Sequence, residues 1–137
     1  MRTSGAVFAN SGSGSGIVDA TTEDAAGGGV GAGPFHSQSN EAWFTHTPGL
    51  KVVYPAFPYD AKGLLLQSFA DPNPVMFFEH KALYRSITQD IPDDYYTIEF
   101  GKAATLKEGS QVSIITYGLG VHWTLEELAA HPETSAD

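Results

Sequence analysis

The chain has 137 residues, of which 42% are hydrophobic and 17% charged, and this composition is typical of one globular domain or pieces of two. Its net charge of −9, from 16 acidic and 7 basic residues, disfavours a nucleic-acid partner or an anionic membrane surface, since both require clustered Lys and Arg. It has no cysteine, which excludes disulfides and cysteine nucleophiles, and no apolar run near the roughly 18 residues of a membrane span. The first residues make a poor signal peptide, so we expect a cytoplasmic protein.

A Gly/Ser-rich segment opens the chain, and we expect residues 1–26 to be flexible. The glycines after it match the loosest dinucleotide-binding spacing, Gly27-x-Gly29-x-x-Ala32. No apolar strand is predicted before this match, and Pro34 stands where the helix of that motif should begin. We therefore interpret the match as accidental.

A single imidazole, His36, follows the glycines and stands among small polar residues. A lone histidine in a loop is by default a hydrogen-bonded structural residue, so only its surrounding motif can favour a catalytic role. A short helix is predicted next, with Ser37 or Ser39 as its N-cap, and Pro48-Gly49 ends it.

The middle of the chain alternates strand, helix and strand. Residues 50–54 are rich in branched side chains and predict a strand. A helix then begins at Pro58, and residues 75–78 form a continuous apolar strand of the kind covered on both faces. This order predicts an α/β fold with a parallel sheet and flanking helices.

The last third of the chain looks like a second unit. Residues 86–96 predict a linker, and two strands are predicted at 95–105 and 111–117. Apolar residues between Val121 and Leu128 then predict a helix, which His131-Pro132 ends. A parallel strand and a helix with nothing after them indicate part of a larger protein.

Several motifs follow one another in a fixed order. They are Phe35-His36-Ser37-Gln38-Ser39, Glu41-Ala42, Pro48-Gly49-Leu50-Lys51-Val52-Val53, Asp60-Ala61-Lys62-Gly63-Leu64-Leu65, Asp71-x-Asn73-Pro74-Val75 and Lys81-x-Leu83-Tyr84-Arg85. Together they resemble the β subunit, or β-like half, of the thiamine-diphosphate-dependent 2-oxo acid dehydrogenase E1 component, whose fold is transketolase-like. The Leu83-Tyr84-Arg85 ending resembles the branched-chain group more than the pyruvate group.

The resemblance implies a domain organisation. Residues 27–85 would form part of a transketolase-like pyrimidine-binding domain, with a parallel sheet and flanking helices. Residues 86–96 would be the linker, and residues 97–137 would start the transketolase C-terminal domain.

It also implies chemistry: oxidative decarboxylation of a 2-oxo acid with thiamine diphosphate, and acyl transfer to a lipoyl-bearing E2 acyltransferase. His36 would be the catalytic acid or base, since an imidazole exchanges protons near neutrality. Ser68, Asp71 and Asn73 would hold a monovalent cation such as potassium, partly through backbone carbonyls. An E1 α subunit or α-like half would share the cofactor and bind magnesium, and a second β copy would complete the assembly.

Alternatives remain open on two points. The family has an apolar strand and a cofactor-activating glutamate upstream of the position of Gly27, and the sequence shows neither. We therefore expect the isolated chain to be inactive, and the alternative is a non-catalytic assembly or binding module that keeps the fold without a working cofactor site. Ser68, Asp71 and Asn73 are equally compatible with a plain turn in which Asp71 acts as a cap.

Overall fold

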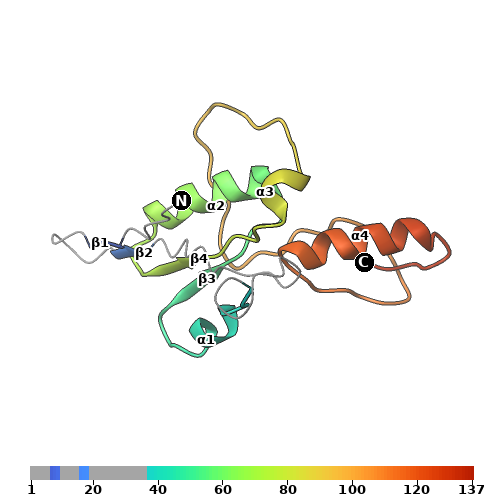
Figure 1. The fold of residues 1–137 in the computed structure, drawn as a ribbon, viewed down its shortest axis with the longest axis horizontal. Coiled ribbons are helices and arrows are strands. Elements are labelled where there is room, and N and C mark those ends of the chain that lie inside the picture. Colours follow the sequence, from blue (N-terminus) through green and yellow to red (C-terminus); the bar gives the residue numbers. More distant parts are fainter. Residues whose placement is uncertain (1–6, 10–15, 19–36) are drawn as a thin grey trace.

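The computed structural model describes residues 7–9, 16–18 and 37–137. Four short strands and four helices follow the chain in the order drawn in Figure 1. They are β1 (Val7–Ala9), β2 (Gly16–Val18), α1 (Glu41–Thr45), β3 (Lys51–Val53), α2 (Pro58–Ala70), β4 (Val75–Phe77), α3 (Leu83–Ser86) and α4 (Leu119–Ala130).

The strands form one sheet in the order β1-β2-β4-β3. β3 and β4 are parallel, with Val52 opposite Met76, and α2 connects them. β2 is parallel to the other edge of β4, with Val18 opposite Met76, and β1 is antiparallel to β2. The parallel β3-α2-β4 unit predicted from the strand–helix–strand pattern is confirmed.

Two of these strands lie in the segment that we expected to be flexible. β1 and β2 both fall within residues 1–26, and β2 supplies the apolar strand upstream of Gly27 that the sequence pattern did not reveal. At three residues each, both strands are too short to show a period-two pattern. The other residues of that segment lie outside the described part of the chain.

The core lies on both faces of β4. Val75 and Phe77 are buried on the face that α2 covers, together with Val53. Met76 and Phe78 are buried on the opposite face, against which Phe44 of α1 packs. Figure 1 shows α2 and α1 on opposite sides of the sheet. Burial of each large apolar side chain contributes about 1.5–3 kcal/mol, so the continuous apolar strand holds the layers together.

Local sequence sets the bounds of the helices. Pro58 occupies the first turn of α2, where its missing N–H costs nothing, and the helix ends before Asp71. The N-cap of α1 is Asn40, without a side-chain capping bond, so the prediction of Ser37 or Ser39 as the cap was wrong. The helix predicted before His131 is confirmed as α4.

The two strands predicted at 95–105 and 111–117 are absent, although the structure describes both ranges completely. The chain there makes one isolated parallel bridge, between Val112 and Ala136. Extended backbone becomes a strand only when a neighbour supplies the ladder, and residues 135–137 are too few to do so. The prediction failed because it read local propensity, and pairing is not local.

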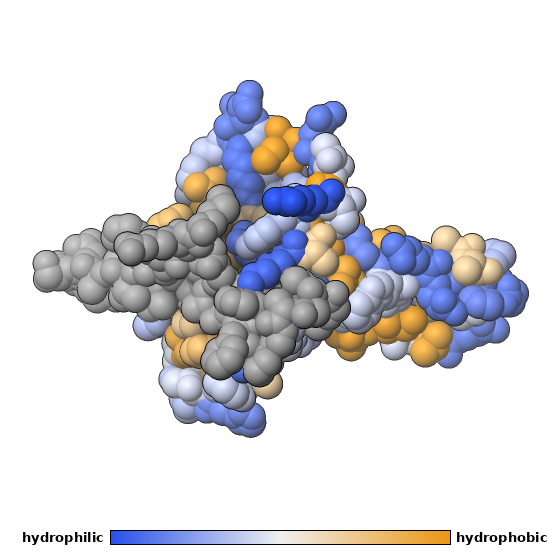
Figure 2. All heavy atoms as spheres, viewed as in Figure 1, coloured by the Kyte–Doolittle hydropathy of each residue, from blue (hydrophilic) through white to orange (hydrophobic). Residues whose placement is uncertain are grey.

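Apolar side chains therefore stay exposed on the C-terminal part. Ile115 is 96% exposed, and Leu106 and Trp123 are more than half exposed. Figure 2 shows apolar surface along one edge of this part, at the right of the view. Among the described residues, none of the helices is long and apolar enough to cross a membrane.

Candidate functional site

The sequence-predicted catalytic residue, His36, lies outside the described residues. The described chain resumes at Ser37 and leads into α1. Phe44 fixes α1 to the sheet through its ring, whose centroid is 5.5 Å from that of Phe78. The chain next to His36 is thus anchored beside the carboxyl end of β4, and in open α/β sheets ligands bind at the carboxyl ends of the strands.

Polar groups from four segments meet near this end of the sheet. Glu41 Oε1 accepts a hydrogen bond from the Tyr117 hydroxyl at 3.1 Å, and the Tyr117 ring lies 5.2 Å from that of Tyr54. The charge of Glu41 also acts on His80, directly after β4. Among the described residues, Glu41 Oε2 and Ser37 Oγ are buried without a hydrogen-bond partner. We call Glu41, Tyr54, His80 and Tyr117 the carboxyl-end cluster.

Burial and the Glu41 charge set the protonation states of this cluster. Burial raises the pKa of Tyr54, and the nearby Glu41 carboxylate raises it further. The pKa of Tyr117 is raised by burial and by its hydrogen bond to Glu41. Burial lowers the pKa of His80, against an opposing effect of Glu41. Near neutral pH the cluster therefore holds two hydroxyl donors and an uncharged imidazole.

His80 also borders a small apolar cavity of about 200 Å³ between the first turn of α2 and α3. Its Nδ1 accepts a hydrogen bond from the Ala82 N–H at 3.2 Å, which fixes the ring. The Tyr84 hydroxyl donates to Glu79 Oε2 at 2.8 Å on the same wall. This volume suits one apolar side chain better than a large cofactor.

The predicted cation residues Ser68, Asp71 and Asn73 do lie together, at the last turn of α2 and in the turn that leads to β4. Asp71 Oδ2 is 2.5 Å from the Lys51 ammonium, and Asp71 Oδ1 accepts hydrogen bonds from the backbone and side-chain amides of Asn73 at 2.9 and 3.0 Å. The Ser68 hydroxyl donates to the Leu64 carbonyl. Burial alone would raise the pKa of Asp71, but the bonds from Lys51 and Asn73 and the Lys51 charge together lower it.

These contacts decide how a cation would fit at the turn. Both carboxylate oxygens of Asp71 are engaged, and the Lys51 ammonium repels a second positive charge. The side chains therefore do not fit a metal site, and only the backbone carbonyl oxygens of the turn suit a hard cation. Within the described ranges, no group of three His, Cys, Asp or Glu residues could hold a metal ion.

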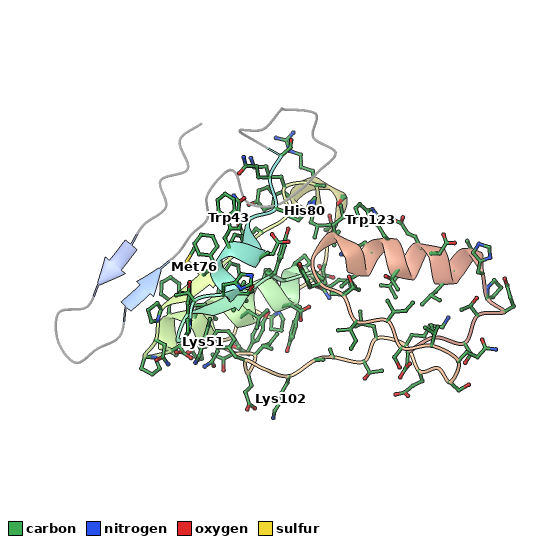
Figure 3. All side chains as sticks on the ribbon, turned by 90° about the horizontal axis from the view of Figure 1, so that it is seen from below. Trp43, Lys51, Met76, His80, Lys102 and Trp123 are labelled. Carbon is green, nitrogen blue, oxygen red and sulfur yellow. The ribbon has the colours of Figure 1, made fainter. Side chains whose placement is uncertain are left out.

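The turn after α2, which holds Asp71 and Asn73, and the carboxyl-end cluster lie at opposite ends of the sheet. Lys51 begins β3 and Asp71 precedes β4, whereas Tyr54 and His80 follow those strands. Figure 3 shows Lys51 and His80 well separated along this direction. The structure therefore separates the two candidate sites, one at the amino ends and one at the carboxyl ends of the parallel strands.

Two of the other histidines have structural contacts. His122 Nε2 is 2.7 Å from the Ala56 carbonyl oxygen, and its ring meets that of Phe57 edge-on at 4.9 Å. His131 lies 3.2 Å from the carboxylates of Glu127 and Glu133. Sequence reasoning missed Tyr54 and Tyr117, because the contacts that give them meaning join distant parts of the chain.

Comparison with known proteins identifies relatives of this chain. The profile described as "Transketolase, pyrimidine binding domain" matches residues 1–87. 2-Oxoisovalerate dehydrogenase subunit beta of Bacillus subtilis (strain 168) is 52% identical over 100 residues, covering 73% of this chain and 31% of the relative. Pyruvate dehydrogenase E1 component subunit beta of the same organism is 50% identical over 111 residues, covering 81% and 33%.

A third relative carries a different activity in its name. Acetoin:2,6-dichlorophenolindophenol oxidoreductase subunit beta of Cupriavidus necator is 50% identical over 103 residues, covering 75% of this chain and 30% of the relative. The chain thus spans about a third of the length of the curated relatives it matches.

Proposed function

We propose a function for a chain that belongs to the transketolase pyrimidine-binding domain family. The resemblance to β subunits of 2-oxo acid dehydrogenase E1 components, predicted from the motifs, is confirmed by the relatives. We infer that the chain is a fragment of such a β subunit, acting on a 2-oxo acid of the branched-chain type. The single observation that carries the β-subunit assignment is the 52% identity to a 2-oxoisovalerate dehydrogenase subunit, and the Leu83-Tyr84-Arg85 motif favours the branched-chain substrate.

The described residues fit one wall of a thiamine diphosphate site. The unpartnered oxygens Ser37 Oγ and Glu41 Oε2, with aromatic rings beside them, suit a flat heterocycle that donates hydrogen bonds. The acidic Glu41 and the net charge of −9 disfavour a diphosphate at this wall. We therefore assign the diphosphate and its magnesium to a partner, an E1 α subunit or α-like half. When bound, the cofactor would supply the electron sink for decarboxylation.

His36 carries the proton chemistry in this proposal. It stands one residue before Ser37, at the start of the chain that α1 anchors to the sheet. Its imidazole would give and take a proton while the acyl group passes to a lipoyl-bearing E2 partner. Glu41 and Tyr117 would fix the position of α1, which follows His36 in the sequence. His80, whose pKa is lowered by burial, would stay uncharged near neutral pH.

For the turn after α2 we propose a monovalent cation such as potassium. The backbone carbonyls of Ser68, Asp71 and Asn73 would be its ligands from this chain. The bonds from Lys51 and Asn73 to the Asp71 carboxylate support this arrangement. They fix the turn and occupy both carboxylate oxygens, so that only backbone carbonyl oxygens would bind the cation.

Reconstitution tests the proposal. The chain is mixed with the E1 α subunit that matches the Bacillus subtilis relative, with thiamine diphosphate, magnesium and potassium. Carbon dioxide release is measured from 3-methyl-2-oxobutanoate and from pyruvate. We expect decarboxylation with preference for the branched substrate, and its loss in the His36→Ala variant. His46→Ala, which changes an exposed histidine of α1's C-cap, is the matched control.

Two observations favour a second function. The chain spans about a third of the length of its relatives, and its C-terminal part exposes apolar side chains. A non-catalytic assembly module would bind a second β copy or the α subunit without turnover. Size-exclusion chromatography of the same mixtures separates the two functions. A complex that forms without decarboxylation in any combination would favour the module.

A further inference from the structure

The motif Asp60-Ala61-Lys62-Gly63-Leu64-Leu65 lies in α2 and has no role in the proposed chemistry. The segment that follows α3 makes a wide arc and then comes back across this helix (Figure 1). Its first contact is at the amino end of α2, where the Tyr59 N–H donates to Gln89 Oε1 at 2.9 Å. We call residues 89–98 the strap.

Aromatic stacking fixes the strap to α2 at Tyr96, two residues before its end. The Tyr96 ring stacks on that of Tyr59, with centroids 4.5 Å apart and an interplanar angle of 16°. The Tyr96 hydroxyl donates to the Tyr59 carbonyl at 2.9 Å. One tyrosine of the strap therefore makes both a ring contact and a hydrogen bond to one residue of the helix.

Lys62 binds the strap at three points. Its ammonium lies 5.1 Å from the centre of the Tyr96 ring and donates hydrogen bonds to the carbonyls of Pro92 and Asp94, the latter at 3.1 Å. Arginine or a shorter side chain would not place a compact ammonium between two carbonyls and a ring face.

Gly63 provides the space for the strap. A Cβ atom on Gly63 would lie 2.7 Å from Ile98 Cγ1 and 2.8 Å from a ring carbon of Tyr96, both closer than real contacts. The Ile98 N–H also donates to the Gly63 carbonyl at 3.2 Å. Glycine in the middle of a helix is unfavourable compared with alanine, so its presence here needs a reason.

The strap leads directly into the core. Two residues beyond Ile98, Phe100 packs with Val53, Val75 and Phe77, and the Lys51 ammonium lies 5.5 Å from its ring centre. The segment is therefore fixed from the first turn of α2 to the core of the sheet.

We propose that Lys62 and Gly63 form a docking site for the connector between the two units, so that residues 89–98 are a fixed strap on α2. The interpretation of residues 86–96 as a simple linker then changes, because Gln89, Pro92, Asp94 and Tyr96 of that range contact α2. The strap sets the point from which the C-terminal part leaves the sheet.

Amide hydrogen exchange of the full 137-residue chain tests the proposal. Lys62→Met keeps an unbranched side chain but removes the ammonium, and we expect exchange at the Ile98 amide to become at least tenfold faster. Lys102→Met is the matched control, since Lys102 makes an exposed pair with Glu99 at 2.7 Å. Equal exchange rates at Ile98 in the two variants would overturn the proposal.

Gly63→Ala gives a second test in which the two explanations predict opposite signs. Alanine favours the helix, so a purely helical role for this position predicts slower exchange in α2 and unchanged or slower exchange at Ile98. The docking site predicts faster exchange at Ile98 while α2 stays protected, with partial recovery of protection at the backbone amide of position 98 in Gly63→Ala/Ile98→Ala. Slower exchange throughout would overturn the proposal.

Discussion

The Tyr117 hydroxyl donates a hydrogen bond to Glu41 Oε1 at 3.1 Å, across 76 residues of sequence. This bond joins the segment before α4 to the first residue of α1, directly after the chain that carries His36. Gly118, with a φ of +55°, allows the backbone after Tyr117 to lie against the Tyr54 ring. A Cβ atom at this position would lie 3.1 Å from a carbon of that ring. The segment before α4 is thus tied to α1 at the candidate site.

Tyr117→Phe removes this hydrogen bond and keeps the ring contact with Tyr54. We expect the free energy of unfolding to fall by about 0.5–1.5 kcal/mol, the usual contribution of one hydrogen bond. Urea denaturation followed by tryptophan fluorescence measures the change. Tyr95→Phe, at a side chain that is 72% exposed, is the control and should change stability by less than about 0.5 kcal/mol.

Stability should fall at alkaline pH because of the same cluster. The pKa values of Tyr54 and Tyr117 are both raised above the ordinary 10.0. A raised pKa in the folded state means that the stabilisation is complete below pH 10 and is lost as the pH rises above it. Urea midpoints between pH 8 and 11 measure this loss, and Tyr117→Phe should reduce it. An unchanged midpoint up to pH 11 would contradict the expectation.

The Lys51–Asp71 pair predicts the acid behaviour. Because the pKa of Asp71 is lowered from 3.8, its stabilisation is present above pH 3.8 and is lost as the pH falls through the folded-state value. Lys51→Met should move acid unfolding to higher pH and cost about 1–3 kcal/mol at neutral pH, since it leaves a buried carboxylate short of a donor. Circular dichroism during acid titration measures both. Lys102→Met, at an exposed ion pair, should cost at most about 1 kcal/mol.

Potassium should stabilise the fold if backbone carbonyls bind it at the turn after α2. Replacing tetramethylammonium by potassium at equal ionic strength should raise the melting temperature by a few degrees. Lys51→Met should keep or enlarge this increase, because it removes a positive charge that repels the cation and leaves the backbone carbonyls in place. A melting temperature that does not depend on the cation would argue for a plain turn.

The sequence predicted the elements whose signals are local. Pro58 marks the first turn of α2, and residues 75–78 are apolar throughout, so both were found from a few neighbouring residues. The helix α4 was found from its apolar spacing. These elements need no distant partner to be recognised, because propensity and periodicity act within a single turn or strand.

The features that the sequence did not reveal depend on distant pairs. The strand β2 is defined by its pairing with β4, and the strap by contacts between residues about thirty positions apart. Extended segments such as 111–117 have strand propensity without a ladder, so propensity alone predicted too much there. Ser68, Asp71 and Asn73 do lie close together, as their motif predicted, but the contact of Lys51 with Asp71 was not predicted.

The exposed C-terminal part has a practical consequence for handling this protein. Residues 111–117 present branched side chains, with Ile115 96% exposed, and pair with the backbone of residues 135–137 only through the Gln111 and Ile114 amides and the Val112 carbonyl. Such a segment can pair with strands of other molecules. The net negative charge of the chain opposes this association, because it makes the molecules repel one another. Concentrated solutions near the isoelectric point of about 4.8 should therefore become turbid with time, whereas dilute solutions at pH 8 and low salt should stay clear.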